Sequence, residues 1–280
     1  MIGGILTNRI IYKKELAPGI FLMDVEAPLV AEKARAGQFV ILMTGEKGER
    51  IPITIADYDP KRGTVRMVFQ VVGKTTAELS TMKVGDTLYS FVGPLGRPSK
   101  IDKYGTVAVV GGGTGVASIY PIARALNEAG NRVISIIGAK TRNLVIMEEE
   151  MRSVSAKVVV TTDDGSYGKR GFVTEALREV LKEEDVKKVW VVGPAIMMKV
   201  ACDVTRPYNV ETIVSLNAIM VDGTGMCGTC RVTVSGKTKF TCVDGPEFDG
   251  HSVDWDEFLN RLNRYRAQEQ LAFELHKRRS

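Results

Sequence analysis

Three cysteines stand close together near the carboxyl end of the chain. Cys227 and Cys230 have C-x₂-C spacing in the glycine-rich stretch DGTGMCGTC, residues 222–230, and Cys242 follows in KFTCVDGP. Thiolates at this spacing in a loop ligate zinc or iron–sulfur clusters, and both kinds of site usually have four protein ligands. The sequence therefore predicts a metal centre, with a fourth ligand to be found elsewhere.

A glycine-rich turn lies near the middle of the chain, in VAVVGGGTGVAS, residues 107–118. The turn consists of Gly111, Gly112, Gly113, Thr114 and Gly115. Between a buried strand and a helix, such a turn lets the backbone approach a pyrophosphate at the helix N-terminus. The usual dinucleotide fingerprint fails on spacing, because Val116 stands where the third glycine belongs. A nucleotide site is the first interpretation, and a tight turn without a ligand is the alternative.

Two further turns follow predicted strands of the same region. They are TTDDGSYG, with Asp163, and VVGPAIMM, with Gly193 and Pro194. Because the carboxyl ends of parallel strands meet at one edge of a sheet, we expect these residues to line one crevice with the glycine turn. The second strand is followed by Lys140 and Arg142 instead of the usual ribose-binding acid. These charges favour a 2′-phosphate or face solvent, so the residues alone do not choose between NAD and NADP.

Two polar breaks interrupt apolar segments of the first hundred residues, IPIT at 51–54 and VVGKTT at 71–76. The second leads into a predicted helix, where backbone N–H groups and threonine hydroxyls are suitable donors to phosphates. An ordinary strand end explains either break taken alone. The candidate cofactor-binding residues here are Pro52, Ile53, Thr54, Val72, Gly73, Lys74, Thr75 and Thr76.

The elements that must position these residues fall into two groups. Short β-rich runs separated by Gly, Pro and Asp predict an antiparallel β-barrel, with residues 74–86 as its only helical candidate. From residue 105 onward, apolar strands alternate with helical periodicity, which predicts a doubly wound parallel α/β sheet. A helical tail follows the cysteine loop, and its apolar stripe packs on its own domain or docks on a partner. The stripe comprises Trp255, Phe258, Leu259, Leu262 and Tyr265. The expected domains are 1–98, 99–216, 217–248 and 249–280.

Composition narrows the class of protein. The 280 residues are 44% hydrophobic and 25% charged, as in ordinary globular proteins, and a net charge of +5 gives little reason to expect nucleic-acid binding. The first residues lack the features of a signal peptide, and no apolar run approaches the roughly 20 residues of a membrane helix. Clustered cysteines suit a metal site in a reducing compartment better than a disulfide framework. We expect a cytoplasmic protein without a membrane partner.

The combination of parts resembles the ferredoxin reductase superfamily, and its order is similar to the electron-transfer subunit of dihydroorotate dehydrogenase. The resemblance covers nearly the whole chain. It implies FAD in the barrel, NAD(H) in the α/β domain and a [2Fe–2S] cluster in the C-terminal loop. The superfamily's flavin strand usually reads Arg-Pro-x-Ser, whereas here Ile51 takes the Arg position and Arg50 comes one residue early. Lys74 is the alternative source of positive charge for the FAD phosphates.

The resemblance also implies the cluster ligands. In the electron-transfer subunit they follow the pattern C-x₄-C-x₂-C-x₁₁-C, whose last three positions match Cys227, Cys230 and Cys242. The first position falls on Asp222, and a carboxylate oxygen can ligate iron. Cys202 is the competing candidate, but it lies in a predicted helix and matches no ligand position. A zinc knuckle with the same residues is the alternative to iron and sulfur.

An Asp in the first ligand position, together with the extension DGPEFDGHSVDWDEF, resembles the small subunit of NADH-dependent reduced ferredoxin:NADP oxidoreductase, a group that includes sulfide dehydrogenase. This resemblance implies an electron-bifurcating heterodimer and NAD(H) as the nucleotide of this chain. The large subunit would be glutamate-synthase-like, carry a second FAD and [4Fe–4S] clusters, and handle ferredoxin and NADP(H). No catalytic side chain is expected. The alternatives are a dihydroorotate dehydrogenase partner, a nucleotide-binding module with structural zinc, and a stand-alone flavin reductase.

Overall fold

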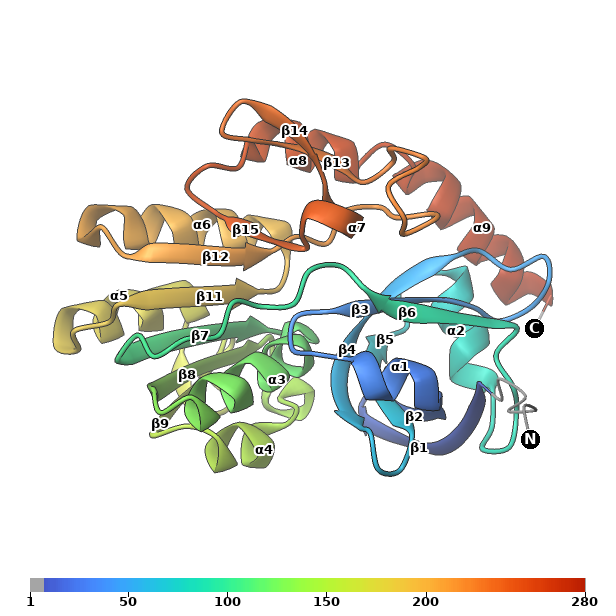
Figure 1. Ribbon diagram of the computed structural model, residues 1–280, viewed down its shortest axis with the longest axis horizontal. Coiled ribbons are helices and arrows are strands. Elements are labelled where there is room, and N and C mark those ends of the chain that lie inside the picture. Colours follow the sequence, from blue (N-terminus) through green and yellow to red (C-terminus); the bar gives the residue numbers. More distant parts are fainter. Residues whose placement is uncertain (1–7, 280) are drawn as a thin grey trace.

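Two sheets form the framework of the molecule, as a computed structural model of residues 8–279 shows (Figure 1). Residues 1–7 and 280, which belong to the first and last predicted domains, lie outside the described residues. The blue-to-cyan half of the ribbon is the predicted barrel, and the green-to-orange half is the predicted α/β sheet. The C-terminal segment runs over both.

The first sheet has six antiparallel strands in the order β1-β2-β5-β4-β3-β6. These strands are β1 (Arg9–Ala17), β2 (Ile20–Glu26), β3 (Phe39–Met43), β4 (Ile51–Asp59), β5 (Thr64–Gln70) and β6 (Ser90–Leu95). The segment before β6 closes the barrel onto β1. The Ile10 N–H donates to the Asp86 carbonyl at 2.8 Å, and Arg9 forms an isolated antiparallel β-bridge with Thr87. Met23, Val40 and Met67 are fully buried in its interior. The predicted antiparallel barrel is confirmed.

The barrel holds two helices, α1 (Pro28–Lys33) and α2 (Lys74–Thr81). The expectation of a single helix over 74–86 was wrong on both counts, because α1 exists and α2 ends at Thr81. Pro28 at the first turn of α1 fixes φ near the helical value, while Val30 and Ala31 are buried against the barrel. Six residues are too few for helical periodicity to be recognised in the sequence.

The second sheet has seven strands in the order β10-β9-β8-β7-β11-β12-β15. They are β7 (Thr106–Gly112), β8 (Arg132–Ala139), β9 (Lys157–Thr162), β10 (Lys169–Arg170), β11 (Lys188–Val192), β12 (Glu211–Ser215) and β15 (Glu247–Asp249). All pair in parallel except β15, which joins β12 antiparallel. The predicted doubly wound sheet is confirmed, with one added edge strand from the C-terminal segment.

Helices cover both faces of this sheet (Figure 1). They are α3 (Gly115–Glu128), α4 (Glu148–Ser153), α5 (Val173–Glu183) and α6 (Ala195–Thr205), with 3₁₀ turns η1 (Arg142–Leu144) and η2 (Arg206–Tyr208). Because strand side chains alternate between faces, Val107 and Val109 join the core under α3, whereas Ala108 and Val110 join the core under α5 and α6. The direction in which successive strands are added to the sheet reverses between β7 and β11. Sheets of this kind bind ligands at that point.

The C-terminal segment is built from β13 (Arg231–Val234), β14 (Lys237–Phe240), α7 (Thr241–Asp244), α8 (Trp255–Leu262) and α9 (Arg266–Arg279). Trp255 and Phe258 of the predicted apolar stripe are buried in the α/β core, and Leu259 and Leu262 pack partly against it. Tyr265 is exposed. The stripe therefore serves this chain's own core, while α9 passes beside α2 (Figure 1). No helix among residues 8–279 is long and apolar enough to span a membrane.

Candidate cofactor sites

The glycine turn after β7 is shaped by two different requirements. Gly113 has φ +57°, in the left-handed region that favours glycine. A Cβ on Gly115 would lie 2.2 Å from the Val192 carbonyl oxygen, so this glycine lets α3 pack directly on β11. In the usual fingerprint the third glycine has that packing role. Here Gly115 performs it one residue before Val116, which explains why the spacing fails while the turn is kept.

The turns after β7 and β11 meet at the reversal of strand order. A Cβ on Gly193 would lie 3.3 Å from the Gly112 nitrogen, and a Cβ on Gly112 would lie 2.4 Å from Met197 Sδ. Pro194 occupies the N-cap position of α6 beside them. The structure thus brings together Gly112, Gly193 and Pro194, as the sequence predicts. Met197 was missed, because a methionine in an apolar helix has no distinguishing pattern.

The turns after β8 and β9 form an open pocket at the same edge of the sheet, lined by Thr141, Arg142, Asn143, Asp164 and Ser166. The predicted Asp163 is exposed and donates its N–H to the Ala139 carbonyl, and the acid that lines this pocket is its neighbour Asp164. Hydrogen bonds from the Ser166 hydroxyl and N–H lower the pKa of Asp164. The Asp-Gly-Ser spacing, typical of an Asx turn, is the signal by which Asp164 is recognisable.

The predicted flavin loop leads into the N-terminus of α2. The Thr76 hydroxyl accepts from the Val72 and Gly73 N–H groups at 3.0 and 3.1 Å, and the Thr75 hydroxyl donates to Glu49 at 2.5 Å. Both hydroxyls therefore already have partners in the chain. The groups suited to phosphates are the Lys74 ammonium, 3.8 Å from Glu78, and the first-turn amides, which have no acceptor within a helix.

The predicted flavin strand β4 pairs with β3, with Pro52 opposite Ile41, Ile53 opposite Val40 and Thr54 opposite Phe39. The strand residues Pro52, Ile53 and Thr54 are half-buried, and Arg50 lies exposed just before the strand begins. Contacts from these residues to FAD remain a prediction.

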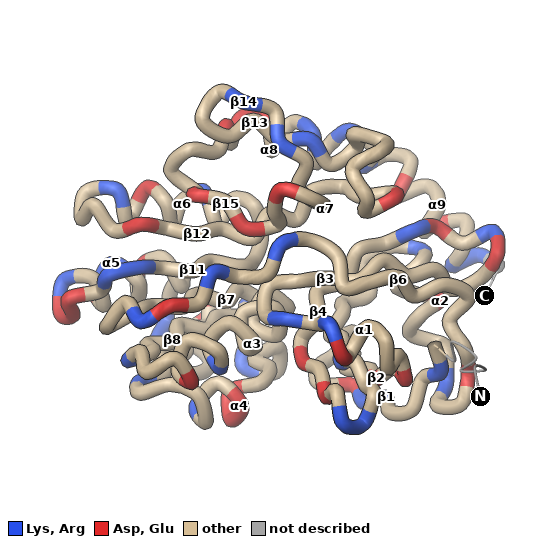
Figure 2. Tube along the Cα trace, in the orientation of Figure 1, with Lys and Arg blue, Asp and Glu red and all other residues tan. Residues whose placement is uncertain are grey.

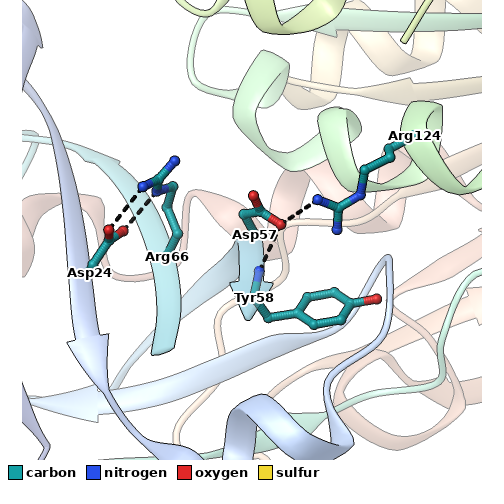
Figure 3. Close-up of polar contacts among 5 residues, drawn as sticks. All are labelled: Asp24, Asp57, Tyr58, Arg66 and Arg124. Atoms are coloured by element: carbon teal, nitrogen blue, oxygen red, sulfur yellow. Dashed lines mark hydrogen bonds and ion pairs between the residues drawn. The ribbon is translucent and has the colours of Figure 1, made fainter. Parts of the chain in front are cut away.

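Arg124 of α3 joins the two sheets beside this strand. Its guanidinium donates to the Asp57 carboxylate of β4 at 2.7 Å, and Asp57 also accepts from the Tyr58 N–H (Figure 3). A second ion pair, between Asp24 and Arg66, lies nearby within the barrel (Figure 3). This ion pair therefore holds helix α3 against the predicted flavin strand.

The cysteine loop contains two contacts between predicted ligands. Cys230 Sγ lies 3.2 Å from Cys242 Sγ, and both thiols are buried. The Asp222 carboxylate accepts from the N–H groups of Thr224 and Cys227 at 2.8 and 2.7 Å. Cys227 is exposed, and hydrogen bonds from Thr229 lower the pKa of its thiol. Burial raises the pKa of Cys242 to about 12.

The donor set of this loop suits a metal centre, since it combines three sulfurs and one carboxylate at the end of a glycine-rich turn. Among residues 8–279, no three His, Cys, Asp or Glu side chains already converge as metal ligands. Cys202 lies elsewhere: it is buried on α6, and a Cβ on Gly250 would come within 2.4 Å of its sulfur. Its surroundings are those of a small core residue, whereas the other three cysteines share one loop and its neighbouring helix α7.

Comparison with known proteins matches two parts of the chain. Residues 217–254 match the iron–sulfur cluster binding domain of dihydroorotate dehydrogenase B, and residues 109–203 match the oxidoreductase NAD-binding domain. A Thermotoga maritima protein named dihydroorotate dehydrogenase B (NAD⁺), electron transfer subunit homolog, is 53% identical over 97% of this chain and 96% of its own length. The chain belongs to the dihydroorotate dehydrogenase B electron-transfer subunit family. It is thus an oxidoreductase subunit, as the sequence predicts.

Other members of this family differ in how much of the chain they share. A solved chain described as NADH-dependent reduced ferredoxin-NADP oxidoreductase, in work on flavin-based electron bifurcation, is 52% identical with a TM-score of 0.92. The alignment covers 98% of this chain and 99% of the solved chain. The Desulforamulus reducens dihydroorotate dehydrogenase B electron transfer subunit is 33% identical over 86% of this chain and 95% of its own length. The family matches favour iron and sulfur over zinc, and support FAD, a [2Fe–2S] cluster and NAD(H) as cofactors.

Proposed function

We propose that this chain is the electron-transfer flavoprotein subunit of a heterodimeric, electron-bifurcating NADH-dependent ferredoxin:NADP⁺ oxidoreductase. One contact carries the electron-transfer part of the proposal: a Cβ on Gly223, next to Asp222, would lie 2.6 Å from Ile41 Cδ1 and 2.8 Å from Leu95 Cδ1. Ile41 is the strand partner of Pro52 in the predicted flavin strand. The cluster loop thus packs directly on the barrel, which suits electron transfer between the two.

Each cofactor has its own proposed set of residues. FAD lies along β4 and at the N-terminus of α2, and NAD(H) lies at the glycine turns after β7 and β11. The cluster is held by Asp222, Cys227, Cys230 and Cys242. A bound flavin supplies the conversion between two-electron hydride exchange and the one-electron steps of the cluster. The chain's own residues position these groups, and we assign none as acid or base. The proposed domain limits are 1–98, 99–216, 217–248 and 249–280.

The proposed partner is a large glutamate-synthase-like flavoprotein with [4Fe–4S] clusters, which binds ferredoxin and NADP(H). The near-complete coverage of the ferredoxin-NADP oxidoreductase chain, at 98% and 99%, supports this partner. Four free cysteines are compatible with a reducing cytoplasm, where we place the complex.

A second candidate is the electron-transfer subunit of a dihydroorotate dehydrogenase. The observation in its favour is the name of the Thermotoga maritima relative together with the match over residues 217–254. This candidate keeps the three cofactors and changes only the partner and the final electron acceptor. The two proposals are therefore separated by the identity of the partner and not by the chemistry of this chain.

Anaerobic affinity purification of the tagged chain from its native cells tests the proposal. We expect a stoichiometric glutamate-synthase-like flavoprotein with [4Fe–4S] clusters, and NADPH-dependent reduction of both NAD⁺ and ferredoxin by the complex. Recovery of a dihydroorotate dehydrogenase subunit with dihydroorotate:NAD⁺ activity would overturn it in favour of the second candidate. A colourless zinc protein without flavin would overturn both.

A further inference from the structure

Two arginines bind the two-residue spacer between Cys227 and Cys230. Arg231 Nη1 donates to the Gly228 carbonyl at 3.2 Å, and Arg261 Nη2 donates to the Thr229 carbonyl at 3.0 Å. Both carbonyls of the spacer therefore accept from a guanidinium. Arg231 follows the loop directly, whereas Arg261 comes from α8, outside the loop.

The N–H ends of the same peptide groups point away from the two guanidinium groups. In a trans peptide, the carbonyl and the next residue's N–H point in opposite directions. With the Gly228 carbonyl turned to Arg231, the Thr229 N–H points away from that guanidinium, and Thr229 lowers the pKa of the Cys227 thiol. In the next peptide group the Thr229 carbonyl points to Arg261, so the Cys230 N–H points away from Arg261. A guanidinium at the carbonyl also polarises the peptide and strengthens its N–H as a donor.

Helix α8 holds Arg261 in place through several contacts with the rest of the chain. The Asp254 side chain caps it by accepting from the Glu257 N–H at 2.9 Å, and Glu257 in turn accepts from the Thr233 N–H of β13 at 3.1 Å. Trp255 and Phe258 are buried beneath it. The side chain of Arg261 is therefore delivered to the loop by a helix anchored in the core.

The positive charge beside the loop is concentrated. Arg231, Arg261 and Arg264 line one small cavity with Thr229, and basic positions follow one another from α8 into α9 (Figure 2). Burial and the neighbouring Arg231 and Arg264 lower the pKa of Arg261. Like charges at close range repel, and an anionic group beside them relieves this repulsion. A [2Fe–2S] cluster with four anionic ligands is such a group, and reduction makes it more negative.

We propose that Arg261, together with Arg231, is a positioning residue that raises the reduction potential of the cluster. It does so by orienting the Cys227–Cys230 spacer, so that its N–H groups face the sulfurs, and by placing positive charge beside the reduced form. Hydrogen bonds to the sulfurs and local charge are two of the factors that set cluster potentials. The inference rests on the proposed cluster at this loop.

The test is a potentiometric titration of the complex as purified from cells, followed by the EPR signal of the reduced [2Fe–2S] cluster. Arg261→Gln keeps a hydrogen-bond donor and removes the charge, whereas Arg261→Lys keeps the charge. The matched control is Arg206→Gln, since Arg206 donates to the His251 carbonyl outside the cluster loop. Iron and sulfide contents and visible circular dichroism are measured for every variant.

We expect Arg261→Gln to lower the midpoint potential by an amount equal to about a tenfold change in the oxidised-to-reduced ratio, about 59 mV for one electron. Arg261→Lys should stay close to wild type, and Arg206→Gln should not differ from it. An unchanged midpoint in Arg261→Gln, or an equal fall in either other variant, overturns the proposal. If Arg261→Gln does not retain iron, the same comparison is made with Arg231→Gln. A wild-type complex without a [2Fe–2S] signal instead overturns the cluster assignment itself.

Discussion

The Arg124 guanidinium on α3 lies 2.7 Å from the Asp57 carboxylate on β4, and this ion pair joins the two sheets (Figure 3). The two side chains are 26% and 25% exposed, so water screens the pair only in part. The rings of Tyr58 and Tyr120 each lie with their centroids 5.6 Å from the guanidinium carbon. At the junction of the proposed flavin and nucleotide sites, one side chain therefore makes an ion pair between the sheets and two cation–π contacts, besides a 4.0 Å ion pair with Glu128 of its own helix.

Replacing Arg124 by Ala should lower the free energy of unfolding by about 1–3 kcal/mol, because it leaves Asp57 half-buried without its partner and removes both cation–π contacts. Denaturant titration of the cofactor-loaded chain measures this loss. Lys157→Ala is the matched control, since Lys157 pairs with Glu183 and the two side chains are 40% and 64% exposed. Equal losses in the two variants would show that the position of Arg124 at the junction has no special effect.

Glu247 should make stability depend on pH. Its carboxyl accepts from the Ser99 hydroxyl, in the segment between β6 and β7, at 2.6 Å, and burial raises its pKa from 4.5 to about 7. An acid with a raised pKa in the folded state destabilises folding above that pKa, because the unfolded chain ionises more readily. This penalty is absent below about pH 4.5, grows up to about pH 7 and is complete above it.

Glu247→Gln should therefore be more stable than wild type at pH 8, by up to about 3 kcal/mol, and should lose this advantage at pH 4.5. Unfolding curves at several pH values measure the difference, with Glu149→Gln as a control on an exposed carboxylate. A stability difference that stays constant between pH 4.5 and pH 8 would contradict the buried titration.

Substitutions of Asp222 and of Cys202 should differ in their effect on the iron content of the protein. Asp222→Ala removes the proposed fourth ligand and the acceptor of the Thr224 and Cys227 N–H groups, so iron per chain should fall well below wild type. Asp222→Cys should retain iron, and Cys202→Ser should do so as well. Iron and sulfide analysis after anaerobic purification gives the answer. Full iron in Asp222→Ala combined with loss in Cys202→Ser would reverse the ligand assignment.

The two glycines of the nucleotide turn should respond differently to alanine. At Gly115 the new Cβ would overlap the Val192 carbonyl, and forcing α3 away from β11 should cost about 3 kcal/mol of stability. At Gly113 the Cβ has open space, so only left-handed strain of about 1 kcal/mol is expected, together with weaker NADH binding. Unfolding and NADH titrations of both variants distinguish the two roles. A smaller loss of stability at Gly115 than at Gly113 would contradict this division.

Short-range sequence patterns were enough to predict most of the fold and many of the candidate site residues. The alternation of apolar strands and helices from residue 105 onward predicted the doubly wound sheet correctly, because strand and helix periodicities are properties of short segments. The glycine turn, the neighbouring turns and the three clustered cysteines were recognisable for the same reason. Where the local signal was short, prediction failed: α1 has six residues, and β15 only three.

Only the tertiary structure decided which distant residues meet. Gly223 lies against Ile41 and Leu95, Arg261 reaches the Thr229 carbonyl, and Asp164 rather than Asp163 lines the pocket beside Arg142. Such contacts depend on how the barrel, the sheet and the C-terminal segment pack, and they leave no fixed spacing in the chain. The sequence by itself therefore determined which chemical groups are present and on which local elements. Packing determined that the proposed flavin, nucleotide and cluster sites adjoin one another.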